Sequence, residues 1–207
     1  DNDGDLDLFF SNGHLNSVSG DNRQSNLLFE NDGLGHFADI SESSGVLATG
    51  KRIHRGAIFA DYNNDGRVDI YVTVNGQQIE DGNGNIVFDA NQGKGILLRN
   101  ETQTENSWIK VRLEGTESNR DGFGAIVSVR TADKLQKQAL SSGQGYFSSN
   151  AKELYFGLKE ADTIDQIDIL WPSGLHQSFQ KIPTRQTVYI VEGEPLHQNT
   201  LILDQRK

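Results

Sequence analysis

The chain contains no cysteine and no methionine, and only three prolines among its 207 residues. The absence of cysteine excludes disulfides, thiolate metal sites and cysteine nucleophiles. No stretch approaches the roughly 18 consecutive apolar residues of a membrane-spanning helix. Basic residues are scarce too, because 19 Lys and Arg stand against 29 Asp and Glu, a formal net charge of −10. Since nucleic-acid binding depends on cationic contacts to phosphate, we expect no nucleic-acid partner and no membrane span.

The residues that are abundant favour turns and short strands. There are 22 glycines, many beside Asn or Asp, and helical periodicity is weak throughout. Acidity is concentrated in residues 1–100, which carry a net charge of −8, against −2 for residues 101–207. We therefore predict one domain over residues 1–100, a second over residues 101–194, and a tail over residues 195–207 with a strand candidate at Leu201–Leu203.

The first half repeats itself. The stretch Asp3–Gly13 matches Asp65–Gly76 with one residue inserted, at an offset of 62 residues. A second matching pair begins at Leu27 and Leu97, at an offset of 70, with the longer loop 77–94 in the second copy. A strand-rich unit of this period is typical of β-propeller blades. Two units are too few for a closed ring, so we predict partial blades, incomplete at the N-terminus.

The second half has a different pattern. Short apolar runs alternate with Gly, Asn and Pro at regular spacing, which is typical of a β-sandwich or barrel. The expected strands are Trp108–Leu113, Gly124–Thr131, Lys152–Phe156, Ile164–Trp171 and Thr187–Glu192. The predicted fold class is all-β: partial propeller blades with calcium loops, followed by a β-sandwich-like domain.

One loop has the side chains that calcium requires. Calcium takes six to eight oxygen ligands, and alternating Asp and Asn side chains can turn inward where a Gly at the sixth position allows a sharp bend. The sequence from Asp61 to Asp69 meets this pattern, with Gly66 at the sixth position. Its predicted ligands are Asp61, Asn63, Asp65, the backbone carbonyl of Arg67, and Asp69. A polar turn without metal is the alternative.

Two further stretches resemble this loop. Residues 1–7 match its positions 3 to 9, and the counterpart of Asp61 would precede the first residue. This partial copy is predicted to hold calcium through Asp1, Asp3 and Asp7. Asp81–Asp89 has oxygen-bearing side chains at matching positions, but its glycines fall elsewhere, so an ordinary loop is favoured there.

The stretch Gly56–Val72 resembles the FG-GAP/VCBS repeat of integrin-α-type propellers, and the resemblance covers about residues 1–100. It implies calcium-binding blades with the ligands given above, and it adds the carbonyl of Asp5 in the partial copy. The second half resembles the ASPIC/UnbV domain of cartilage-acidic-protein-like secreted proteins. The residues that carry this second resemblance are Gly115–Ala125, Ser142–Phe147, Tyr155–Leu158 and Trp171–Gly174.

The sequence offers little support for catalysis. Its five histidines show no metal-ligand spacing, and Ser173 is not in a Gly-x-Ser-x-Gly elbow. His54 and Arg55 are either a surface site pair or structural residues. Arg120 is either paired with Asp121 or a partner carboxylate in a recognition loop, or part of a simple turn. Trp171 is expected to pack at the end of a buried strand, with a sugar-stacking platform as the alternative.

These observations predict a non-enzymatic calcium-binding module for interaction or adhesion, secreted or at the cell surface. Extracellular modules bind calcium at about 10⁻⁴–10⁻³ M, which fits that location. The partner would be an extracellular protein or glycan. The alternative is a self-assembling subunit, a homo-oligomer or filament, that uses exposed strand edges with calcium near its interfaces. An accessory domain of a carbohydrate-active enzyme is a third, weaker interpretation.

Overall fold

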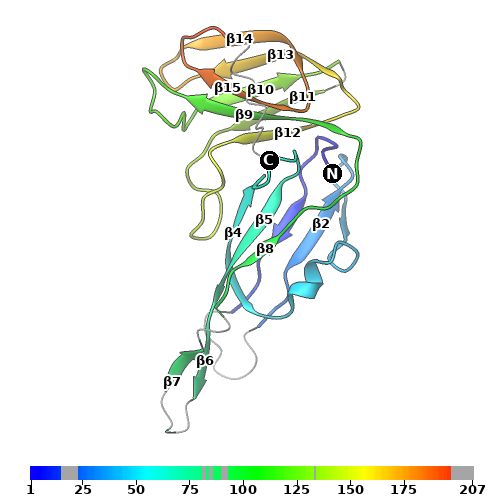
Figure 1. Ribbon diagram of the computed structural model, residues 1–207, viewed down its shortest axis with the longest axis vertical. Helices are drawn as coiled ribbons and strands as arrows, with labels where there is room; N and C mark the ends of the chain where they lie inside the picture. The colour runs from blue at the N-terminus through cyan, green and yellow to red at the C-terminus, as the bar shows by residue number, and fades with distance from the viewer. Residues whose placement is uncertain (15–22, 81–82, 84–85, 90–92, 133, 197–207) are drawn as a thin grey trace.

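A computed structural model of the chain describes residues 1–14, 23–80, 83, 86–89, 93–132 and 134–196. The fold is nearly all β, as predicted, with a single short 3₁₀ helix, η1 (Val46–Thr49), among these residues. No helix in the described part is long and apolar enough to cross a membrane. A β-sandwich lies at one end of the long axis, two blade sheets lie beside it, and a hairpin projects at the other end (Figure 1).

The first half folds into two antiparallel blade sheets. The first sheet has the order β1-β2-β3 and the second the order β4-β5-β8. Their strands are β1 (Leu8–Phe10), β2 (Leu27–Asn31), β3 (Phe37–Asp39), β4 (Ile53–Ala60), β5 (Asp69–Asn75) and β8 (Ile96–Leu98). The turn predicted between residues 31 and 35 connects β2 to β3.

Strand register corrects one detail of the predicted repeat. Leu8 lies opposite Phe29 in the first sheet, and its counterpart Ile70 lies opposite Leu98 in the second. The second matching pair is therefore offset by 69 residues, so that Ile96 and not Leu97 is the counterpart of Leu27. The comparison of letters was wrong because each copy has two adjacent leucines. A slip of one residue would turn every side chain to the other face of the sheet.

The longer loop of the second copy contains a hairpin of its own. Strand β6 (Gln77–Glu80) pairs with β7 (Ile86–Asp89), and this hairpin projects away from the blade sheets (Figure 1). The acidic stretch Asp81–Asp89 spans its tip. Asp81 and Asn85 lie outside the described residues, as does the strand candidate Leu201–Leu203.

The second half is a sandwich of two sheets. One has the order β11-β10-β13-β14 and the other β12-β9-β15, in which β9 and β15 are parallel. All five expected strands are present with shifted ends, and β11 and β14 are additional. The strands are β9 (Ser107–Glu114), β10 (Ile126–Arg130), β11 (Leu135–Ala139), β12 (Leu154–Lys159), β13 (Thr163–Leu170), β14 (His176–Pro183) and β15 (Gln186–Val191).

The hydrophobic core belongs to the sandwich. Alternate residues of its strands face inward and form one cluster that includes Ile109, Val127, Phe156 and Ile167. Trp171 follows the last residue of β13 and is only 2% exposed, so it packs in the core as expected. A sugar-stacking platform at Trp171 is incompatible with this burial.

The buried carboxylate of Glu192, just after β15, holds two of the motif segments together. It accepts hydrogen bonds from the backbone N–H groups of Thr116, Glu117 and Ser118, at 2.8, 3.0 and 2.7 Å. The hydroxyls of Ser118 and Ser173 also donate to it. Burial by itself raises the pKa of Glu192, but these hydrogen bonds outweigh it and lower the pKa to about 2. Ser173, in the Trp-Pro-Ser-Gly motif, thus has a structural role.

Replacing this carboxylate should destabilise the sandwich in a pH-dependent way. The pKa of Glu192 falls from 4.5 to about 2 on folding, so its charged form contributes roughly 3 kcal/mol. That contribution is complete above pH 4.5 and is lost as the pH falls toward 2. We expect Glu192→Gln to be much less stable than wild type in urea unfolding at pH 7, with the difference shrinking at pH 3. Exposed Glu194→Gln is the control, and equal stability of both variants at pH 7 would contradict this role.

Candidate functional site

The acidic loop Asp61–Asp69 connects β4 to β5 and lies against the sandwich. Asn64 and Gly66 both have a left-handed backbone, with φ of 58° and 85°. At Gly66 a Cβ atom would come within 2.0 Å of the Trp108 ring. Glycine is therefore required at the sixth position both by the turn and by the approach of the sandwich.

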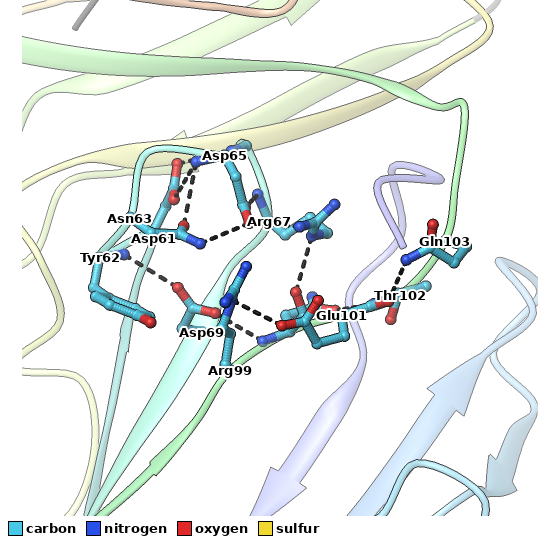
Figure 2. A network of polar contacts seen from close by, with 12 residues as sticks. Asp61, Tyr62, Asn63, Asp65, Arg67, Asp69, Arg99, Glu101, Thr102 and Gln103 are labelled. Atoms are coloured by element: carbon cyan, nitrogen blue, oxygen red, sulfur yellow. Dashed lines mark hydrogen bonds and ion pairs between the residues drawn. The ribbon is translucent and has the colours of Figure 1, made fainter. Parts of the chain in front are cut away.

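Side chains of the loop hold its backbone in place (Figure 2). The carboxylate of Asp61 accepts hydrogen bonds from the N–H groups of Asp65 at 2.9 Å and Gly66 at 3.0 Å. Asp65 in turn accepts the N–H of Arg67 at 3.0 Å. These are the local turns that Asp and Asn stabilise, so the sequence pattern predicts the loop conformation from short-range contacts alone.

Asp69, at the ninth position, is held from outside the loop. Its carboxylate accepts the N–H of Tyr62 at 3.2 Å and that of Asn100 at 2.7 Å. The Asn100 side chain also donates to the carbonyl of Val68 at 3.2 Å. The sequence analysis did not identify Asn100, although an offset of 69 would have matched it to Asn31.

The same arrangement exists in the first copy. The N–H of Asn31 donates to Asp7 at 2.9 Å, and its side chain donates to the carbonyl of Leu6 at 3.1 Å. Asn2 and Gly4 have φ of 66° and 87°, as at the matching positions of the second loop. Asp1 and Asp3 accept the N–H groups two residues ahead at 3.0 and 3.1 Å. The two loops therefore share one backbone design.

A buried lysine of the sandwich lies in the second loop. Lys110, on β9, is 1% exposed. Its Nζ lies 2.7 Å from Asn64 Oδ1, 3.3 Å from Asp61 Oδ2 and 3.7 Å from Glu153 Oε2. Within the loop, the Arg67 guanidinium pairs with Asp65 at 2.5 Å. Two cations of the protein thus balance the acidic loop, and neither role was foreseen from the sequence.

The predicted ligands are together in each loop but do not form a gathered metal cluster. Among the described residues, no three His, Asp or Glu side chains are placed to hold a metal ion. The donor chemistry nevertheless fits calcium, since all donors are oxygens and each carboxylate has lone pairs beyond those used. In the first loop, Asp5 Oδ1 is buried without a hydrogen-bond partner. Burial and the neighbouring Asp3 carboxylate raise the pKa of Asp5, which indicates negative charge that a cation would relieve.

His54 and Arg55 have structural positions. His54 is 1% exposed, its Nδ1 lies 3.0 Å from the carbonyl of Asn12, and burial lowers its pKa. Arg55 donates to the carbonyls of Gly13 and His14 at 3.0 and 3.1 Å. Both residues therefore join β4 to the segment that follows β1, and they do not form a surface site pair.

A polar hollow of about 450 Å³ lies on the sandwich, with Tyr189 among its lining residues. Ion pairs cross it: Arg112 with Glu153, Lys152 with Asp121 at 2.7 Å, and Arg120 with Glu114 at 3.7 Å. The expected pair of Arg120 with Asp121 is therefore wrong, because each finds a partner on another segment. The turn itself is fixed by Asn119, whose side chain bonds both the N–H and the carbonyl of Phe123.

Comparisons with known families identify both halves. Residues 1–72 match the FG-GAP-like repeat, and residues 115–196 match the family described as ASPIC and UnbV. These matches do not distinguish the cartilage-acidic-protein-like subfamily. No curated protein matches the chain. FG-GAP repeats typically occur in extracellular or cell-surface proteins, and the two domains fit an interaction module in that location.

The buried Lys110 should be essential to the junction between the halves. Lys110→Met leaves the Asp61 carboxylate, whose side chain has no exposed surface, without its ammonium partner. Breaking a buried pair in this way costs roughly 3–5 kcal/mol. We expect a loss of that size in urea unfolding with chelator present, partly recovered in the double variant Lys110→Met with Asp61→Asn. Lys137→Met, at an exposed site on β11, is the control, and the role is disproved if both single variants unfold alike.

Proposed function

Because the chain carries an FG-GAP-like repeat followed by an ASPIC/UnbV domain, we propose that it is a non-enzymatic calcium-binding interaction module that works outside the cell or at the cell surface. The observation that carries this proposal is the duplicated acidic loop. Its two copies share left-handed Asn and Gly residues and the same strand-end asparagine. Repetition of a strained, acidic turn supports a common ligand more than two independent turns would.

Calcium would be held by oxygen atoms alone. In the second loop the ligands would be Asp61, Asn63, Asp65, the carbonyl of Arg67, and Asp69. In the first loop they would be Asp1, Asp3, the carbonyl of Asp5, and Asp7. A bound calcium ion supplies two positive charges in each acidic turn, which relieves the repulsion between their carboxylates. In the second loop it would compete with the Arg67 guanidinium for Asp65.

The interaction role concerns an extracellular protein or glycan as partner. The polar hollow on the sandwich supports such a role, since it presents charged groups of both signs beside Tyr189. Tyrosine offers a flat apolar surface with a hydroxyl, a combination that is frequent in recognition surfaces. The hollow is lined on one side by the turn that carries Arg120 and Asp121.

Calcium titration tests the metal proposal. We expect calorimetry to detect two sites with dissociation constants of about 10⁻⁴–10⁻³ M, and the thermal midpoint to rise with calcium concentration by linkage. Asp65→Asn should remove the site in the second loop and Asp3→Asn the site in the first. Arg67→Ala should strengthen binding in the second loop several-fold, because it removes the competing cation.

Asp165→Asn, an exposed carboxylate of the sandwich, serves as the control and should titrate like wild type. The metal proposal would be abandoned if about 10 mM calcium, well above those dissociation constants, gave neither heat nor a change in the thermal midpoint.

A further inference from the structure

The two blade sheets stack on each other in a defined direction. The ring of Phe9, on β1, meets that of Phe59, on β4, edge to face with centroids 6.3 Å apart. Phe59 lies opposite Ile70, so these two residues share one face of the second sheet. Phe9 projects from the face of the first sheet opposite to that of Leu8 and Phe10. One face of each sheet is therefore used in this contact, and the two faces are different.

The repeat gives each face a counterpart in the other sheet. We call leading face the side with Phe59, Ile70 and Val72 in the second sheet. Its counterpart in the first sheet bears Leu8, Phe10, Phe29 and Phe37. We call trailing face the side with Phe9 and Leu28 in the first sheet and with Tyr71 and Leu97 in the second. Within the chain, the trailing face of the first sheet covers the leading face of the second.

Exposure differs between counterparts as this stacking requires. On the covered leading face Val72 is 0% exposed, whereas its counterpart Phe10, on the leading face of the first sheet, is 47% exposed. On the covered trailing face Phe9 and Leu28 are half-buried. Their counterparts Tyr71 and Leu97 are exposed at 43% and 49%. The molecule thus presents one apolar leading face and one apolar trailing face, the two halves of a contact it already makes internally.

We propose that copies of this chain associate head to tail, the exposed trailing face of one copy covering the exposed leading face of the next. Such a contact is heterologous, so it builds either a closed ring or an open filament. It repeats an interface that the sequence already encodes, and it does not depend on the proposed calcium sites. The high negative charge of the chain opposes close approach of copies, so association strengthens as salt screens that repulsion.

The geometry favours faces over strand edges for this association. The open edge of β4 is covered in part by the loop that precedes β12. The N–H of Phe59 donates to the Asn150 side chain at 3.1 Å, and the N–H of Ala151 donates to the carbonyl of Phe59 at 3.2 Å. These bonds use groups that an added strand would need.

Light scattering on size-exclusion fractions tests the proposal, over concentrations from micromolar to near-millimolar in moderate salt and with chelator. Wild type should form oligomers whose mass rises with concentration. Phe10→Lys, which spoils the leading face, and Tyr71→Lys, which spoils the trailing face, should each be monomeric. Both side chains are exposed, so the variants should keep the wild-type thermal midpoint. Leu8→Lys and Leu97→Lys provide a second variant for each face.

Mixing the two variants is the decisive measurement. Phe10→Lys retains a working trailing face and Tyr71→Lys a working leading face, so an equimolar mixture should form a 1:1 dimer and nothing larger. Leu135→Lys, an exposed site on β11 away from both faces, should associate like wild type. Monomeric wild type at every concentration would overturn the proposal, as would self-association of Tyr71→Lys alone, which would mean that two leading faces pair with each other.

Discussion

The structure depends on one buried charge. Lys110 extends from the sandwich into the acidic loop of the second blade sheet, where Asp61, Asn64 and Glu153 surround its ammonium group. A lysine can be buried only where such partners replace its water, and these partners come from both halves of the chain. The contacts around it follow from this placement. The loop glycine lies on the Trp108 ring, and the hydroxyl of Tyr155 accepts the N–H of Asp61.

The acidic loops therefore have two roles that compete for the same oxygens. Their carboxylates stabilise left-handed turns through backbone N–H groups, and they also carry charge that a cation must balance. In the second loop Lys110 and Arg67 supply that balance, whereas Asp5 in the first loop keeps a buried oxygen without a partner. Under the proposed function, calcium would act on groups that also join the two domains. Metal binding and the stability of the junction would then be linked.

The repeat explains the stacking of the blade sheets as well as their loops. In each copy an asparagine at a strand end bonds the ninth residue of the loop, which ties the loop to the neighbouring strand. Because the copies also share strand register, each apolar face recurs with the same neighbours. A contact that suits one pair of faces then suits every further pair, which is why an internal repeat can also direct association between copies.

The sequence by itself determined what short-range chemistry decides. The Asp, Asn and Gly spacing predicted the acidic loops because each carboxylate bonds backbone groups a few residues ahead. Apolar alternation predicted five sandwich strands but missed β11 and β14, whose exposed residues are largely polar. Tertiary structure decided the partners that come from far along the chain: Lys110 is 49 residues from Asp61, and Ser118 is 74 residues from Glu192. Such contacts leave no periodic signal, because they arise only when packed sheets bring distant segments together.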